Sequence, residues 1–168
     1  TTEIYTLSLH DALPILCDKK CFYCRPEGEG NHSSDRGKKL SADDFIYLIN
    51  EIVKYGVSSI RFTGGEPMLN SNIYKIIRAV RQMDGVNEIS IVTRSLKLKK
   101  QVPLLKSAGL NSITISLDSL NRERLSNITM VNSLDKLIEG IKTCSELCLP
   151  IKLNTVIMKG IKIGRAHV

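Results

Sequence analysis

From Ser41 onward the sequence alternates short apolar runs with amphipathic segments, and this alternation restricts the possible folds more than any other feature. The patterns predict helices over 45–53, 73–80, 102–108 and 134–141, and strands over 58–63, 89–93, 113–117 and 152–157. A strand–loop–helix unit that repeats gives parallel strands joined by right-handed crossovers. The expected class is therefore α/β, either a (βα) barrel or a doubly wound open sheet. In both, functional residues are expected in the loops at the carboxyl ends of the strands.

Local signals at the ends of the predicted helices agree with this assignment. Ser41 and Asp44 have the spacing of a capping box, in which each satisfies a backbone N–H group of the other. Gly56 and Gly109 follow the first and third helical patterns, where a glycine commonly ends a helix.

The composition is that of a globular domain and excludes several classes of function. The chain has 168 residues, 42% hydrophobic and 24% charged, which is enough for one domain with a core. No apolar run approaches the roughly 20 residues that a membrane span needs. The net charge is +7, but the basic residues are scattered and only 5% of residues are aromatic. We therefore expect no nucleic-acid partner and no membrane partner.

Three of the five cysteines, Cys17, Cys21 and Cys24, lie in one short segment. Such clustering indicates a metal site in the reducing cytoplasm. An electron-transfer cluster needs a fourth cysteine nearby, and none follows until Cys144. Three thiolates would leave one iron of a [4Fe–4S] cluster open to a cofactor or substrate. The alternatives are a zinc site with His32 as its fourth ligand, and an iron–sulfur module that only relays electrons.

The spacing Cys-x3-Cys-x2-Cys, with Tyr23 just before the last cysteine, resembles the signature of the radical S-adenosylmethionine (SAM) superfamily. The resemblance implies a partial (βα) barrel in which Cys17, Cys21 and Cys24 are the catalytic and metal-binding residues. It also implies that they hold a [4Fe–4S] cluster whose open iron chelates SAM, with Tyr23 near the cofactor. One electron then cleaves SAM to methionine and a 5′-deoxyadenosyl radical, which takes a hydrogen atom from the substrate.

The turn Gly64-Gly65-Glu66-Pro67 directly follows a predicted strand, where a ligand loop is expected. Two glycines let the backbone approach a ligand closely, and Glu66 can accept a hydrogen bond from an ammonium group. The turn resembles the family motif that holds the SAM amino group, so the resemblance makes Gly64, Gly65 and Glu66 candidate cofactor contacts. Ser116, near the end of the third predicted strand, resembles the family serine that contacts SAM.

The segments around Arg61 and Lys152 resemble the GTP 3′,8-cyclase family, which acts in molybdenum cofactor biosynthesis. The resemblance implies a lyase that converts GTP to 3′,8-cyclo-7,8-dihydro-GTP. It further implies that Arg61 and Lys152 bind GTP, as suits cations facing a triphosphate. It also implies an electron donor such as flavodoxin or ferredoxin. The alternative is a related peptide-modifying radical SAM maturase.

Three departures from that family concern the substrate rather than the cluster. The segment Val92-Thr93-Arg94-Ser95 stands where the family usually has Thr-Thr-Asn-Gly, so a threonine that contacts GTP is replaced by Val92. Arg25 stands where a methionine usually follows the last cysteine. The family's early substrate arginine would fall near His10, where no resemblance is found.

Cys144 and Cys148 belong to the apolar stripe of the last predicted helix. Free cysteine packs as a small hydrophobic residue, so both are predicted to be core residues.

The two ends of the sequence differ from the rest. Residues 1–15 and 163–168 resemble translated sequencing-adaptor sequence, which leaves 16–162 as the partial radical SAM barrel. No good strand is predicted before the cysteines, because Tyr5–Leu9 alternates weakly and Pro14 interrupts the approach. A barrel fragment would expose strand edges, so we expect poor soluble expression and no GTP turnover.

Overall fold

The computed structural model describes residues 5–9, 17–24 and 40–158. Its strands are β1 (Tyr5–Leu9), β2 (Val57–Phe62), β3 (Glu88–Thr93), β4 (Ser112–Ser116) and β5 (Ile151–Asn154). Its helices are α1 (Ala42–Val53), α2 (Ile73–Arg81), α3 (Leu98–Ala108), α4 (Arg122–Thr129) and α5 (Leu134–Glu146), with a short 3-10 helix at Pro67–Leu69. The predicted α/β class is confirmed.

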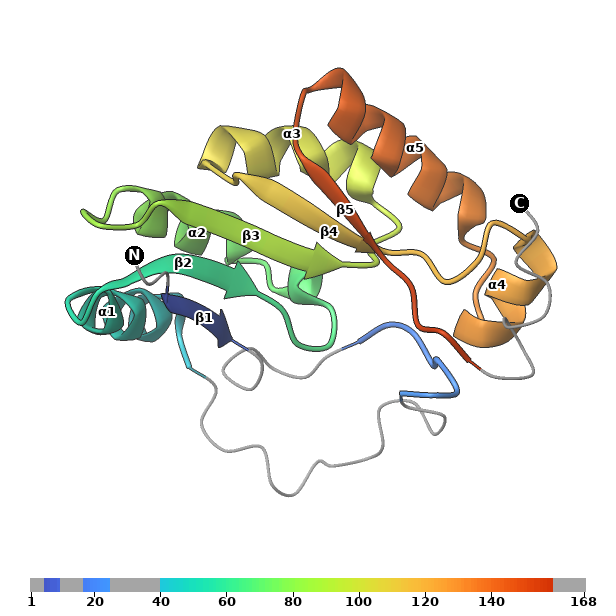
Figure 1. The fold of residues 1–168 in the computed structure, drawn as a ribbon, viewed down its shortest axis with the longest axis horizontal. Coiled ribbons are helices and arrows are strands. Elements are labelled where there is room, and N and C mark those ends of the chain that lie inside the picture. Colours follow the sequence, from blue (N-terminus) through green and yellow to red (C-terminus); the bar gives the residue numbers. More distant parts are fainter. Residues whose placement is uncertain (1–4, 10–16, 25–39, 159–168) are drawn as a thin grey trace.

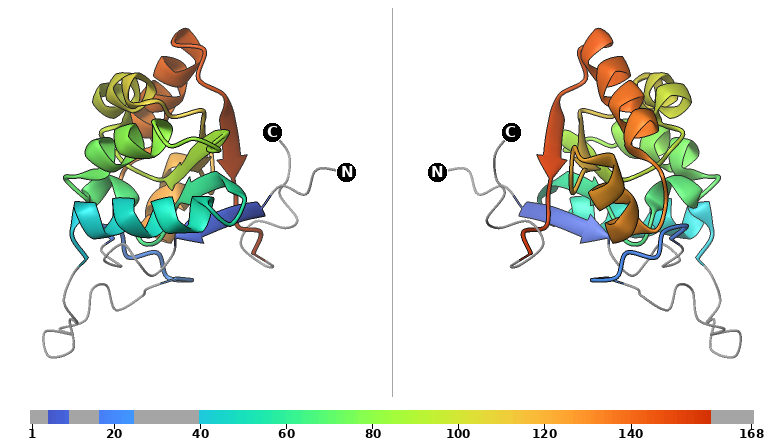
Figure 2. Two further views of the ribbon diagram at one scale, coloured as in Figure 1. Left: turned by 90° about the vertical axis from the view of Figure 1, so that its left-hand side faces the viewer. Right: turned by 90° about the vertical axis from the view of Figure 1, so that its right-hand side faces the viewer.

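The described strands form one parallel sheet in the order β1-β2-β3-β4-β5. The strands follow chain order without the reversal that defines the switch point of a doubly wound sheet. Helices α1, α2, α3 and α5 lie on one side of the sheet, and no described helix covers its other face (Figures 1 and 2). This arrangement is that of a partial (βα) barrel, and it decides between the two architectures that the periodicity left open.

The predicted helix signals work as expected in the structure. At the start of α1 the Asp44 N–H donates to Ser41 Oγ at 3.1 Å, and the Ser41 N–H donates to Asp44 Oδ2 at 2.7 Å. At the end of α3, Gly109 has a φ of 103°, a left-handed conformation that favours glycine. A Cβ atom there would also lie 2.6 Å from Cγ of Arg81, so both backbone and packing require glycine.

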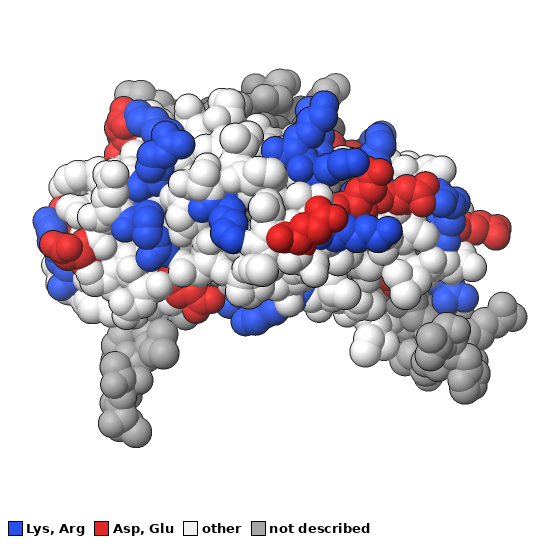
Figure 3. Space-filling model, turned by 90° about the horizontal axis from the view of Figure 1, so that it is seen from above, with Lys and Arg blue, Asp and Glu red and all other residues white. Residues whose placement is uncertain are grey.

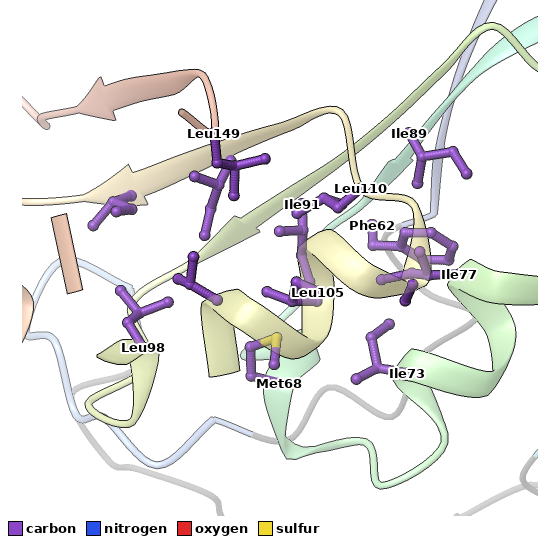
Figure 4. Packing of buried hydrophobic residues seen from close by; sticks show 14 of the residues in the cluster. Phe62, Met68, Ile73, Ile77, Ile89, Ile91, Leu98, Leu105, Leu110 and Leu149 are labelled. Atoms are coloured by element: carbon purple, nitrogen blue, oxygen red, sulfur yellow. The ribbon is translucent and has the colours of Figure 1, made fainter. Parts of the chain in front are cut away.

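The hydrophobic core lies between the sheet and the helices (Figure 4). Ile91 of β3 and Phe62 of β2 are fully buried there, against Ile73 and Ile77 of α2 and Leu105 of α3. Each such side chain contributes about 1.5–3 kcal/mol through burial. Because strand side chains alternate between faces, the residues between these core positions point to the face without helices.

A strand precedes the cysteine segment, contrary to the prediction from the sequence. Strand β1 pairs in parallel with β2, with Leu9 opposite Phe62 and an irregular register between Tyr5 and Thr6. The edge of β2 offers unpaired backbone donors and acceptors, and pairing them outweighs the weak alternation of this segment. Pro14 lies outside the described residues, as do the rest of 10–16, residues 1–4 and residues 159–168.

Helices α3 and α4 show where local patterns were insufficient. Helix α3 begins at Leu98 rather than at 102, because Leu98 and Val102 are both fully buried, and this burial offsets the cost of Pro103 inside the helix. Helix α4 was not predicted, since it buries little besides Leu125 and Ile128 among polar residues.

The two later cysteines differ in environment. Cys144 is buried on α5, and burial raises the pKa of its thiol to about 11, as expected for a core cysteine. The core assignment of Cys148 was wrong, because this residue is exposed. Helix α5 ends at Glu146, and Cys148 adopts a φ of 50°, so it has left the helical stripe that the sequence suggested.

The surface in Figure 3 carries interspersed charges of both signs rather than one basic patch. Exposed ion pairs among the described residues include Lys99–Glu139 at 3.7 Å and Arg122–Asp135 at 2.6 Å. In the described part of the chain, no helix is both long enough and apolar enough to cross a bilayer.

Candidate radical SAM site

The cysteine segment 17–24 lies beyond the carboxyl ends of the strands, where the loops of a (βα) barrel form its site (Figure 1). It is anchored to α4, since the Phe22 N–H donates to the Ile128 carbonyl at 3.3 Å. Within the segment, the Cys24 N–H donates to the Cys21 carbonyl at 2.9 Å and closes a turn. The position expected from the sequence is thus the observed one.

The three thiols differ in exposure. Cys21 is buried, Cys17 is half-buried and Cys24 is exposed. Burial raises the pKa of the Cys17 and Cys21 thiols, and the Arg94 guanidinium opposes this effect at Cys21. Within the described residues, no three His, Cys, Asp or Glu side chains converge closely enough to hold a single metal ion. The structure therefore places the thiols on one segment without gathering them around one point.

Glu66 fixes the glycine turn against β3. Its side chain is buried, with Oε1 accepting from the Met68 N–H at 3.1 Å and from Thr93 Oγ1 at 2.5 Å. Its Oε2 accepts from the Arg94 N–H at 2.7 Å. Burial raises the pKa of Glu66, while these three hydrogen bonds oppose the shift. The carboxylate thus joins the turn after β2 to the end of β3.

The two glycines before Glu66 lie at the surface of this site. Gly64 is exposed, with a φ of 135°, and Gly65 is half-buried. A side chain at Gly64 would be strained at that φ, so the glycine gives the turn its shape. The backbone at this point is therefore partly exposed, and its contact with a cofactor stays a prediction.

Arg94 and Asp118 form the most connected polar pair of the site. Both are buried, and Arg94 Nη2 contacts Asp118 Oδ2 at 2.5 Å. The guanidinium also donates to Cys21 Sγ at 3.1 Å and to the Ser116 carbonyl at 3.2 Å. Asp118 Oδ1 accepts from the Val156 N–H at 3.0 Å. The pair thereby connects the cysteine segment with the ends of β3 and β4 and with the chain after β5.

Tyr23 joins the same network. Its hydroxyl donates to Asp118 Oδ2 at 2.9 Å and accepts from Arg94 Nη2 at 3.2 Å. Burial is the main cause that raises the pKa of Tyr23 to about 12. Its ring packs edge-on against Phe22, with centroids 5.8 Å apart. Of the predicted cofactor residues, the structure thus brings Cys21, Tyr23 and Ser116 together around Arg94.

The predicted substrate residues lie on the face of the sheet that has no described helix. Arg61 alternates with the core residues Ile60 and Phe62 of β2 and donates to Ser90 Oγ at 3.5 Å. Lys152 is exposed on β5, next to Thr114 in the register. Three strand spacings separate β2 from β5, about 14 Å along a flat sheet. The two cations therefore flank a polar face without contacting each other.

Sequence reasoning assigned no role to Arg94 or Asp118. Arg94 follows the end of β3 and Asp118 follows the end of β4, and both lie on the face of the sheet that carries Ser116. The alternation of side chains along the two strands would have indicated this face. His32, Arg25 and His10 lie outside the described residues, so their expected positions stay predictions.

Comparison with known proteins places the chain in a family. Residues 15–166 match the family model of the radical SAM superfamily. The chain is 40% identical over 146 residues to a GTP 3′,8-cyclase of Clostridium acetobutylicum, covering 86% of this chain and 45% of that protein. It is 41% identical over 157 residues to a GTP 3′,8-cyclase of Listeria monocytogenes, covering 90% and 47%. The chain spans about half the length of these curated relatives.

Solved structures show the same fold at low identity. Streptococcus suis SuiB bound to S-adenosylmethionine matches with a TM-score of 0.74 and 22% identity, over 93% of this chain and 35% of that one. An anSMEcpe structure with bound AdoMet and a peptide matches with a TM-score of 0.72 and 15% identity, over 92% and 44%. With the match of the family model over nearly the whole sequence, this chain belongs to the radical SAM superfamily.

Proposed function

We propose that this chain carries the radical SAM centre of a GTP 3′,8-cyclase, which converts GTP to 3′,8-cyclo-7,8-dihydro-GTP in molybdenum cofactor biosynthesis. The observation that carries the proposal is the position of the Cys17–Cys24 segment over the strand ends, beside the Glu66 turn. The two relatives described above, both GTP 3′,8-cyclases, support the choice of reaction.

The donor set fits a [4Fe–4S] cluster at Cys17, Cys21 and Cys24. Thiolates are the preferred ligands of iron–sulfur clusters. Each of the three would bind a different iron of a cubane, so they need not converge on one point as the ligands of a single zinc ion must. The absence of a convergent group of three among the described residues is consistent with this geometry. When bound, the cluster and SAM supply the carbon radical that takes hydrogen from the substrate.

The residues proposed to hold SAM surround this segment. The accessible backbone at Gly64 and Gly65 and the buried carboxylate of Glu66 form one side. Ser116 and Tyr23 form another, and Arg94 links them. Glu66 already accepts three hydrogen bonds from the protein, so we assign it the task of holding the turn in shape as well as facing the cofactor.

Arg61 and Lys152 are the proposed substrate contacts, on the open polar face next to the cofactor side. Both are exposed in the structure and neither belongs to an ion pair among the described residues. An anionic triphosphate is the ligand that would use two such cations. A one-electron donor such as flavodoxin or ferredoxin and a cytoplasmic location complete the proposal, since a thiolate-bound cluster needs a reducing compartment.

GTP binding tests the substrate proposal. We expect Arg61→Gln and Lys152→Gln each to weaken GTP binding to the reconstituted chain by about tenfold, the usual effect of losing one charge-assisted hydrogen bond. Equilibrium dialysis with labelled GTP measures the dissociation constants. Lys75→Gln is the matched control, because Lys75 is exposed on α2 and pairs with Asp43 instead. Equal weakening by all three variants, or no GTP binding by the unchanged chain, would contradict the assignment.

A peptide-modifying maturase is the second candidate, and one residue favours it. Val92 lies half-buried on the open face, where the GTP 3′,8-cyclase family has a threonine that contacts GTP. A Val92→Thr variant in the dialysis experiment distinguishes the two candidate functions. Tighter GTP binding by this variant supports the cyclase, and unchanged binding supports the maturase.

A further inference from the structure

The side chain of Arg94 reaches a proposed cluster ligand, Cys21, directly. Arg94 follows β3 at the point where the GTP 3′,8-cyclase family has a short asparagine. Its backbone N–H donates to Glu66 Oε2 at 2.7 Å, which fixes the direction in which the side chain leaves the strand. The side chain is buried and ends at the Cys21 sulfur, with Nη1 and Sγ 3.1 Å apart.

The contacts of Arg94 hold the guanidinium in this orientation. Nε donates to the Ser116 carbonyl, and Nη2 contacts both Asp118 Oδ2 and the Tyr23 hydroxyl. Nη1 is therefore left to face Cys21, while the carboxylate of Asp118 is bound on the other terminal nitrogen. A planar guanidinium provides these donors in a fixed arrangement that a lysine ammonium does not reproduce.

A hydrogen bond to a cluster thiolate has a known physical effect. It withdraws electron density from sulfur, and a nearby positive charge stabilises the form of the cluster that carries one more electron. Both effects raise the reduction potential, and burial strengthens them because little water screens the charge. The carboxylate of Asp118 opposes the charge effect, but the donated hydrogen bond to sulfur remains.

We propose that Arg94 is a positioning residue that donates a hydrogen bond to the Cys21 thiolate of the bound cluster and raises the reduction potential of that cluster. The proposal rests on the cluster site proposed above. In the redox step the cluster gains one electron from an external one-electron donor, and no bond of Arg94 is made or broken. Arg94 thus makes this chain's cluster easier to reduce than a neutral side chain at the same position would.

The measurement is a redox titration of the reconstituted chain, followed by EPR of the reduced cluster, with dithionite as the reductant. The variants are Arg94→Gln, which removes the charge, and Arg94→Lys, which keeps the charge but lacks the planar set of guanidinium donors. Arg78→Gln is the matched control, because Arg78 is an exposed arginine in the last turn of α2 and makes no hydrogen bond to the cysteine segment among the described residues. We expect the midpoint potential to fall in Arg94→Gln, to fall less in Arg94→Lys, and to stay unchanged in Arg78→Gln.

The possible results distinguish a failure of this inference from a failure of the proposed function. A cluster that forms in all variants with one common potential would show that Arg94 is only a structural link between segments, and the cluster site itself would stand. If Arg94→Gln does not fold, Arg94→Lys decides, and an unshifted potential there overturns the inference. If the unchanged chain binds no cluster, the proposed function fails, and this inference fails with it.

Discussion

Cys21→Ala is expected to abolish retention of the cluster, lowering bound iron and sulfide at least about tenfold after anaerobic reconstitution and gel filtration. Three thiolates are the whole proposed protein ligand set, and Cys21 is the buried one of them. Its loss also leaves Arg94 Nη1 without its sulfur partner. The damage therefore affects both the cluster and the network that positions it.

Cys148→Ala is the control for this prediction. Cys148 is also a free cysteine, but it is exposed beyond the end of α5. We expect this variant to bind as much iron and sulfide as the unchanged chain. Equal iron content in the two variants would show that Cys21 is not a ligand. Retention of zinc in place of iron would favour the zinc site that the sequence left open.

Asp118→Ala is expected to lower the free energy of unfolding by about 3–5 kcal/mol, the cost of leaving a buried charge without its partner. Arg94 would lose its carboxylate, and the Val156 N–H and Tyr23 hydroxyl would lose their shared acceptor. Denaturant titration followed by circular dichroism measures the change.

The matched control for the ion pair is Asp135→Ala. Asp135 pairs with Arg122 in a similar two-charge contact, but both side chains are exposed to solvent. Water screens such a pair, so the midpoint of unfolding should hardly move. A loss of stability as large for Asp135→Ala as for Asp118→Ala would mean that burial of the Arg94 pair is not what makes it important.

The parts of the fold that could be predicted from sequence are those specified by local signals. Helix α1 followed from the Ser41 capping box, and β3 and β4 followed from short apolar runs whose isoleucines are buried in the core. Strand β1 could not be predicted in this way, because the partner edge of β2, distant in sequence, stabilises it. Cys148 could not either, since its assignment depended on where α5 ends.

The candidate site also has one part that could be predicted from the sequence and another that could not. The spacing of Cys17, Cys21 and Cys24 indicated cluster chemistry because the ligands of one short segment are visible in the sequence itself. The network of Arg94 and Asp118 joins residues 24 positions apart and reaches the cysteine segment. Contacts of that kind depend on the register of β3 and β4, which only the structure provides.

EPR of the reduced, reconstituted chain, recorded with and without SAM, shows whether the cysteine segment holds a cluster with an iron open to SAM. We expect a [4Fe–4S]⁺ signal whose g-values change when SAM is added, because SAM would bind the iron that Cys17, Cys21 and Cys24 leave free. A cluster signal that SAM leaves unchanged would indicate a module that only relays electrons. A folded chain that binds zinc and no iron would contradict a [4Fe–4S] cluster at Cys17, Cys21 and Cys24.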